Sequence, residues 1–148
     1  MNKKKQIIAG QVVIMAKNSF LLVKERSAPY RGKWNFPTGK LETGETLIET
    51  AVRETKEETG YTAEITDFLR ICQSLKQPGL NIILVIFRAR IVSGKLNYDK
   101  TELIEAKWFS RPEFDRVPDT DLVHPEMRNT IKIAFLSPQP VEKLYTVL

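Results

Sequence analysis

The apolar residues of this chain fall in short blocks that polar turns separate, and the first two blocks predict a pair of strands. Residues 6–16 form a run rich in Ile and Val, and residues 20–23 form a second apolar run. Residues 17–19 between them are polar and few enough for a tight turn. This arrangement predicts a β-hairpin at the start of the chain.

Further blocks predict the rest of a sheet. A short extended piece is expected over residues 33–37, and a strand over residues 63–73. After a turn at residues 77–79, the near-continuous apolar run 80–92 indicates a long strand with a buried, central position. Residues 106–109 are expected to close the sheet.

Helical periodicity appears in three places. Residues 46–59 predict a helix, residues 111–114 a short helical turn, and residues 125–136 a final amphipathic helix with Pro125 near its start. Strands with one helix between them and another behind favour an α/β fold, in which helices sandwich a mixed β-sheet.

The helix over residues 46–59 carries charge of a particular kind. At about 100° per residue, Glu54, Glu57 and Glu58 fall within roughly 100° of arc on one face. Like charges at helical spacing cost a few tenths of a kcal/mol per pair, so this crowding calls for a compensating cation. Mg2+ prefers oxygen ligands and completes its shell with water and phosphate, which suits carboxylates on an open face. Arg53 lies four positions before Glu57 and can brace it.

A charged helix face can also be merely solvated, and most mixed-charge runs are. The glycines that flank the helix have local explanations too, because Gly44 suits a tight turn and Gly60 a left-handed helix cap. These local roles are compatible with a metal site. The joint register of the glycines, Glu45 and the helix carboxylates favours the metal site over the solvated face.

Residues 39–61, GKLETGETLIETAVRETKEETGY, resemble the signature of the Nudix (MutT-like) hydrolase superfamily, and every charged and glycine position of that signature is matched. The resemblance continues in the preceding segment 34–39 and in the acidic, tryptophan-containing segment 102–109. Two apolar positions of the signature carry a different kind of residue in this chain, Thr55 and Tyr61, and both differences are interpreted as packing variation. The Thr55 hydroxyl is expected to bond the carbonyl four residues back.

The resemblance implies an α/β/α sandwich and a Mg2+-dependent enzyme, with Mn2+ as a substitute ion. The implied reaction is hydrolysis of a phosphoanhydride in a nucleoside diphosphate linked to a further group, such as a nucleoside di- or triphosphate or ADP-ribose. The implied catalytic residues are Arg53, Glu54, Glu57 and Glu58. The implied metal ligands are the Gly39 carbonyl, Glu54, Glu57 and Glu58, with structural support from Glu45, Gly44 and Gly60. The downstream candidates for the general base are Glu102 and Glu105.

Substrate-binding residues are harder to predict. Arg26, Arg31 and Lys33 precede the signature and can meet distal phosphates, although exposed loop cations are often only solvated. Trp34 can offer an aromatic platform to a base. His124 is expected to be an exposed loop residue outside the chemistry.

Composition fits a single domain over residues 1–148, because 148 residues of which 42% are hydrophobic can bury one core. Residues 1–5 form a basic start without a signal-peptide core, and no apolar run reaches the roughly 20 residues of a membrane span. Cys72 is the only cysteine, which fits a reducing compartment, and a cytoplasmic location is expected without a membrane partner.

Two alternative functions remain open. The net charge of +5 favours anionic partners, so removal of a 5' cap or diphosphate from RNA is one alternative, although three of the positive charges lie in residues 3–5. The other is a Nudix-like module that senses a nucleotide without catalysis. Such modules usually lose signature carboxylates, whereas this chain retains them. A small nucleotide is the expected partner, and the oligomeric state is left open.

Overall fold

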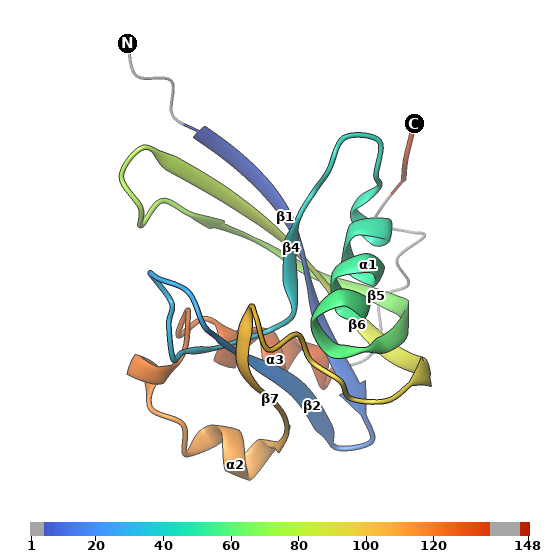
Figure 1. Cartoon of the computed structure of the whole chain (residues 1–148), viewed down its shortest axis with the longest axis vertical. Helices are drawn as coiled ribbons and strands as arrows, with labels where there is room; N and C mark the ends of the chain where they lie inside the picture. Colours follow the sequence, from blue (N-terminus) through green and yellow to red (C-terminus); the bar gives the residue numbers. More distant parts are fainter. Residues whose placement is uncertain (1–4, 137–145) are drawn as a thin grey trace.

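A mixed seven-stranded sheet carries the other elements of the protein (Figure 1). The computed structural model describes residues 5–136 and 146–148. The strands are β1 (Lys5–Ala16), β2 (Ser19–Glu25), β3 (Trp34–Asn35), β4 (Thr38–Lys40), β5 (Tyr61–Ser74), β6 (Leu80–Gly94) and β7 (Leu103–Ser110). The helices are α1 (Leu47–Thr59), α2 (Arg111–Asp115), the 3-10 helix η1 (Asp119–Asp121) and α3 (Met127–Ala134). Among these helices none is long and apolar enough to cross a membrane.

Strand β1 joins two parts of the sheet. It pairs with β2 only at Met15–Phe20 and Ala16–Ser19, which confirms the predicted hairpin but limits it to two residue pairs. Towards its N-terminus β1 leaves β2 and pairs in parallel with β6 on one edge and antiparallel with β4 on the other. Strand β2 instead pairs with β3 and β7. The two strands therefore diverge and leave an opening between them.

Both faces of the sheet are covered, as the α/β/α prediction requires. Alternate residues of β1 point to opposite faces. Val13 packs with Met127 and Ile131 of α3 on one side. Val12 packs with Ala51 of α1 on the other side. The helices thus lie on opposite faces of a mixed sheet, which confirms the predicted sandwich.

Several boundaries differ from the prediction. Strand β6 is paired on both edges, as expected, but its buried side chains are confined to its central part, from Leu84 to Ala89. Strand β4 was not predicted, because its glycine-containing sequence has no apolar pattern. Helix α3 begins at Met127, and Pro125 lies in the turn before it, where its carbonyl accepts a bond from Arg128 N. Residues 1–4 of the predicted basic tail lie outside the described residues, while Lys5 already belongs to β1.

Local contacts fix both ends of α1. Thr46 is the N-cap, and its hydroxyl accepts a bond from Glu49 N while the Glu49 carboxylate accepts one from Thr46 N. At the other end Gly60 adopts a left-handed conformation with φ of 81° and bonds to Lys56 O. Because both ends are fixed, the register of the carboxylates along the helix is fixed as well.

The Thr55 hydroxyl does not make the hydrogen bond that the sequence predicts. Its side chain is fully buried, yet its hydroxyl has no hydrogen-bond partner in the part of the chain that the structure describes. The predicted bond to the carbonyl four residues back is therefore wrong. The equivalent bond is made one turn later, where Thr59 Oγ1 donates to Thr55 O at 2.6 Å. A buried hydroxyl without a partner costs about 1–3 kcal/mol.

These two threonines give opposite predictions for the same substitution. Thr55→Val removes an unpaired buried hydroxyl and should raise the free energy of unfolding by about 1 kcal/mol. Thr59→Val removes a buried hydrogen bond and should lower it by about 1 kcal/mol. Urea unfolding of both variants and the wild type measures the difference. A Thr55→Val protein less stable than the wild type would contradict the assignment of its hydroxyl.

Candidate functional site

Arg53 of α1 lies at the centre of a group of carboxylates. Its Nε donates to Glu45 Oε1 at 2.5 Å, and its Nη2 donates to Glu45 Oε2 at 3.0 Å. Its Nη1 reaches Glu54 Oε1 at 2.7 Å and Glu57 Oε2 at 3.2 Å. The guanidinium therefore binds one carboxylate by two parallel bonds and two others by its far nitrogen, an arrangement that fixes its plane.

Glu45 is committed to this arrangement. Besides Arg53, its carboxylate accepts bonds from Thr50 Oγ1 at 2.8 Å and from Glu42 N at 3.3 Å. The hydrogen bond from Arg53 is the main cause that lowers the pKa of Glu45 to about 2, and bonding to Glu45 in turn raises the pKa of Arg53. Glu45 thus remains ionised at neutral pH and holds Arg53 in place.

Gly39 of β4 lies directly against Glu54. A Cβ atom at position 39 would be 1.9 Å from Glu54 Cδ and 2.1 Å from Glu54 Oε1, which is far inside contact distance. The Glu54 carboxylate therefore occupies the space that any other residue at position 39 would fill. Burial raises the pKa of Glu54, against the effect of the bond from Arg53.

Glu58 is the most deeply buried of the helix carboxylates, with 7% of the residue exposed. Burial raises its pKa well above the ordinary value, and the nearby Glu25 and Glu54 act in the same direction. One backbone donor opposes this, since Thr38 N bonds to Glu58 Oε2 at 3.2 Å. The third helix carboxylate, Glu57, has a side chain that is 58% exposed.

Glu25, the last residue of β2, belongs to this group and was missed by the sequence analysis. Its Oε1 accepts a bond from Asn35 Nδ2 at 2.9 Å. Burial raises the pKa of Glu25, and Glu102 adds to the shift. The sequence does hold a signal for it, because Glu25 lies two residues after the apolar block 20–23 and so at the end of the strand that this block predicts.

The two candidates for the general base lie in different surroundings. Glu102 precedes β7, and its carbonyl accepts a bond from Arg26 N at 3.1 Å, next to Glu25. Its charge makes a minor contribution that raises the pKa values of Glu25, Glu54 and Glu58. Glu105 lies opposite Lys24 on the neighbouring strand and pairs with its Nζ at 3.6 Å. Glu102 therefore lies on the side of Glu25, whereas the Glu105 carboxylate is paired with Lys24 of β2.

The donor set fits a hard divalent cation. Burial is the main cause that raises the pKa values of Glu25, Glu54 and Glu58, and neighbouring carboxylates add to it, so a bound cation would favour their ionised forms even though Glu54 is already paired with Arg53. Within residues 5–136 and 146–148, no three carboxylate, imidazole or thiol side chains already converge closely enough to hold a metal ion. Arg53 occupies the space between Glu54 and Glu57 instead.

The predicted substrate-binding residues do not form one cluster. Trp34 is 7% exposed, and its ring packs edge-on against Phe109 at 4.9 Å with Lys24 Nζ 4.5 Å from its centroid, so it lacks the free face of a stacking platform. Arg26 bonds to Leu103 O at 3.2 Å through Nη2. Arg31 is exposed in the loop before β3.

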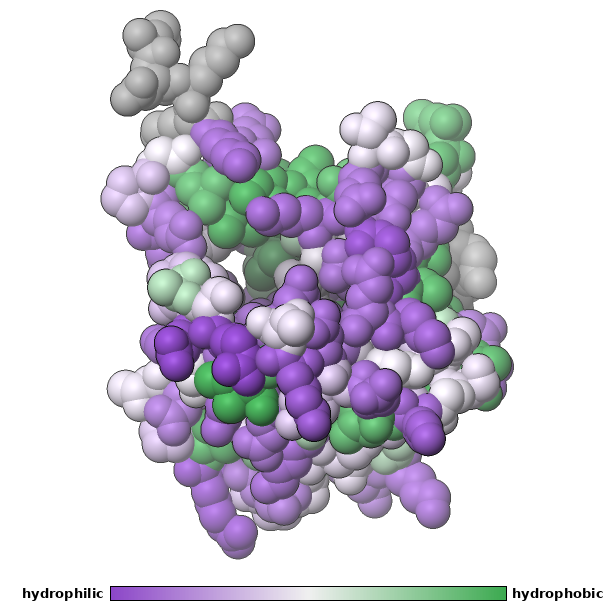
Figure 2. Space-filling view, viewed as in Figure 1, coloured by the Kyte–Doolittle hydropathy of each residue, from purple (hydrophilic) through white to green (hydrophobic). Residues whose placement is uncertain are grey.

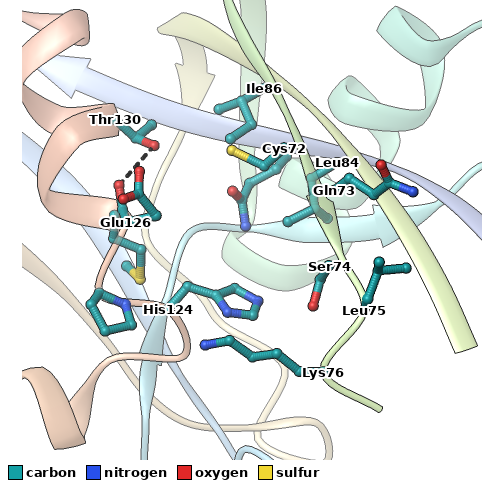
Figure 3. Close-up of a pocket in the computed structure, with 13 residues that line it drawn as sticks. Cys72, Gln73, Ser74, Leu75, Lys76, Leu84, Ile86, His124, Glu126 and Thr130 are labelled. Atoms are coloured by element: carbon teal, nitrogen blue, oxygen red, sulfur yellow. Dashed lines mark hydrogen bonds between the residues drawn. The ribbon is translucent and has the colours of Figure 1, made fainter. Parts of the chain in front are cut away.

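Two adjoining cavities lie beside the carboxylates. The first, of about 390 Å³, reaches from Gly39 and Glu25 to the loop that contains Tyr30. Figure 2 shows the molecule hollowed in this region, between β1 and β6 above and that loop below. The second cavity, of about 350 Å³, continues towards β5 and the start of α3 and is mainly apolar (Figure 3). The residues that line both are Gln11, Leu84 and His124.

His124 corrects the expectation of an exposed loop residue. It is partly buried, and its ring packs against Tyr30 at 5.9 Å. Its backbone is placed by Val123 N, which bonds to Trp34 O at 2.9 Å. Burial lowers the pKa of His124, and the charges of Lys76 and Lys33 add to the effect. In Figure 3 the His124 ring and the Lys76 side chain enter the same space.

Comparison with known proteins agrees with this geometry. The NUDIX domain family matches residues 4–131. A solved structure described as a NUDIX hydrolase from Nitrosomonas europaea superposes with a TM-score of 0.82 at 26% identity, over 97% of this chain and 98% of that chain.

Two curated relatives are similar over shorter stretches. The 8-oxo-dGDP phosphatase NUDT18 of Mus musculus is 33% identical over 103 residues, which are 68% of this chain and 31% of that protein. An ADP-ribose pyrophosphatase of Methanocaldococcus jannaschii is 33% identical over 90 residues, 60% of this chain and 53% of that protein. The chain thus spans between about a third and about half of the length of these relatives. With the match over residues 4–131 and the shared fold, the chain belongs to the NUDIX domain family.

Proposed function

We propose that the protein is a Mg2+-dependent hydrolase of a phosphoanhydride bond in a nucleoside diphosphate derivative. One observation carries the proposal. Carboxylates with raised pKa values gather around Gly39 and Glu25, where a cavity large enough for part of a nucleotide opens. A cation bound there would meet the phosphates of a ligand in that cavity.

In this proposal Glu54, Glu57 and Glu58 hold the metal together with the Gly39 carbonyl. Bound Mg2+, or Mn2+ in its place, would neutralise phosphate oxygens and lower the pKa of water. Glu57 has an exposed side chain bonded to Arg53 Nη1 at 3.2 Å, whereas Glu58 is buried and bonded to Thr38 N. The two therefore contribute differently, one as an adjustable ligand and one as a fixed ligand.

Arg53 and Glu45 position this set in the proposal. The Glu45 carboxylate fixes the plane of Arg53, and Arg53 keeps Glu54 and Glu57 on one side of the helix. Glu102 is the candidate that accepts a proton from the attacking water, because it lies near the buried carboxylates while Glu105 is paired with Lys24. Gly44 and Gly60 support the loop before α1 and its last turn.

The substrate class follows from the cavities and the relatives. The cavity that begins at Gly39 leads into the more apolar second cavity, so the phosphates would lie near Gly39 and the nucleoside would extend towards His124. The similarity to an 8-oxo-dGDP phosphatase and to an ADP-ribose pyrophosphatase supports nucleotides of either kind as substrates. Arg26, Arg31 and Lys33 are the candidates that meet distal phosphates.

A substrate panel tests the proposed function. Nucleoside di- and triphosphates, their 8-oxo forms, ADP-ribose and capped RNA are incubated with Mg2+, with Mn2+ and with EDTA, and released phosphate and nucleotide are measured. We expect metal-dependent cleavage of at least one small nucleotide. Glu57→Gln and Glu58→Gln should each reduce turnover by more than the roughly 10- to 100-fold typical of residues around a metal site.

The matched control is Glu49→Gln on the same helix, which leaves the site untouched and retains a side chain able to complete the N-terminal cap. Full activity of both Glu57→Gln and Glu58→Gln would refute the metal site. Cleavage of capped RNA alone would support the RNA alternative, and nucleotide binding without any cleavage would support a sensing module.

Gly39→Ala tests the close approach of Glu54. The added Cβ would displace the Glu54 carboxylate, and a misplacement near 1 Å can cost roughly 100-fold in rate. Gly44→Ala is the control, because position 44 has open space but a φ of +87°, so its cost of about 1 kcal/mol should appear in stability and leave turnover nearly unchanged. Equal activity of the two variants would contradict the role of Gly39.

Glu102→Gln and Glu105→Gln distinguish the two candidates for the general base. Loss of a general base typically reduces the rate by about 10²–10⁴-fold, and we expect this for Glu102→Gln. Glu105→Gln should only weaken its exposed pair with Lys24, which is worth roughly 0–1 kcal/mol of stability. Steady-state turnover of both variants is measured at saturating metal concentration. A larger loss of turnover in Glu105→Gln than in Glu102→Gln would instead identify Glu105 as the general base.

A further inference from the structure

Gln11 is a buried polar residue of β1 that none of the proposed roles uses. It is 4% exposed and lines both cavities at their junction. A buried amide normally has partners for both its oxygen and its nitrogen. The way in which the amide is held therefore decides which of its atoms is left for a ligand.

The first neighbour that orients Gln11 is Asn35. Asn35 Oδ1 accepts a bond from Phe36 N at 3.0 Å, and Asn35 Nδ2 donates to Glu25 Oε1 at 2.9 Å. A backbone donor and a carboxylate thus fix which end of the Asn35 amide is oxygen. Facing that oxygen at 3.1 Å, Gln11 must present its nitrogen.

The second neighbour is Thr38. Its hydroxyl donates its single hydrogen to Phe36 O at 2.7 Å. It can therefore only accept from Gln11, whose Nε2 lies 2.8 Å away. Both hydrogens of the Gln11 amide are now used, and its orientation follows from two anchors on the backbone of Phe36.

What remains of Gln11 is a hydrogen-bond acceptor. In the described part of the chain no donor bonds to Gln11 Oε1, and this oxygen is not among the atoms fully shut off from the solvent. The surroundings it shares with Leu84 and Ile86 in the second cavity are apolar. A ligand that fills the cavity would take this oxygen out of water, so a donor on the ligand is needed to avoid the cost of a buried acceptor without a partner.

The Gln11 side chain is also connected, through one neighbour each, to two carboxylates of the site. Asn35 links it to Glu25, and Thr38 links it to Glu58 through the bond from Thr38 N at 3.2 Å. The orientation of Gln11 Oε1 in the cavity therefore depends on the same hydrogen bonds that hold Glu25 and Glu58, beside which the phosphates of a ligand would lie.

We propose that Gln11 Oε1 is a specificity-determining acceptor that selects nucleotides whose base presents an N–H donor into the cavity. This inference rests on the proposed function, since it places a nucleoside there. A base with an amino or ring N–H at that position is bound, and an isosteric base that lacks the donor leaves Oε1 without a partner and is rejected.

The test compares nucleotide pairs that differ by one donor. Guanosine and inosine nucleotides differ by the 2-amino group, and adenosine and purine riboside nucleotides differ by the 6-amino group. For each pair the ratio of kcat/KM is measured in the wild type and in Gln11→Met, which keeps the length of the side chain and removes its polar atoms. Gln6→Met is the control, because Gln6 lies on the same strand, is exposed and lines neither cavity.

We expect the wild type and Gln6→Met to prefer the donor-bearing member of at least one pair by about 10-fold, and Gln11→Met to bring that ratio close to one. Gln11→Glu keeps acceptor oxygens but lacks the two hydrogens that hold the amide against Asn35 Oδ1 and Thr38 Oγ1, so it should also bring the ratio close to one. If Gln11→Met does not fold, Gln11→Leu is measured in its place.

Two results would overturn the inference. One is a wild type without a preference in either pair, and the other is a preference that persists in Gln11→Met. The dissociation constants of the same nucleotides give the same ratios without catalysis. If the wild type binds them but cleaves none, the proposed function fails, and the binding ratios still decide the role of Gln11.

Discussion

The crowding of like charge in a partly buried space is the constraint on which the site depends. Burial raises the pKa values of Glu25, Glu54 and Glu58, and each of them lies near another carboxylate. Within residues 5–136 and 146–148, Arg53 is the cation that pairs with a member of this group, through Glu54, and Glu45 holds Arg53 there. This balance leaves the buried carboxylates short of positive charge, which is the condition under which a divalent cation binds well.

The sheet makes such an arrangement possible. Because β2 leaves β1 after two residue pairs, Glu25 at the end of β2 comes near Glu58 of α1 instead of continuing a β1–β2 ladder. The same divergence opens the cavities beside Gly39. Arg88 pairs with the buried Asp67 at 2.7 Å and also bonds to Ala134 O, so it ties the end of α3 to the sheet.

Much of this could be predicted from the sequence where the interactions are local. The hairpin, the central position of β6 and the extent of α1 follow from apolar spacing and from caps that lie within four residues of their partners. The prediction failed where local rules competed with packing. Thr55 illustrates this, since a helix allows its hydroxyl to bond the preceding turn, whereas the folded protein buries it unpaired.

The sequence by itself determined the carboxylate face of α1, because helical geometry places residues three and four positions apart on one side. Only the tertiary structure decided that Glu25 joins that face, that Gly39 leaves room for Glu54, that Glu102 rather than Glu105 lies nearby, and that Gln11 presents an oxygen. These relations connect segments far apart in the chain. Their distances depend on how the strands diverge and pack, which no local spacing encodes.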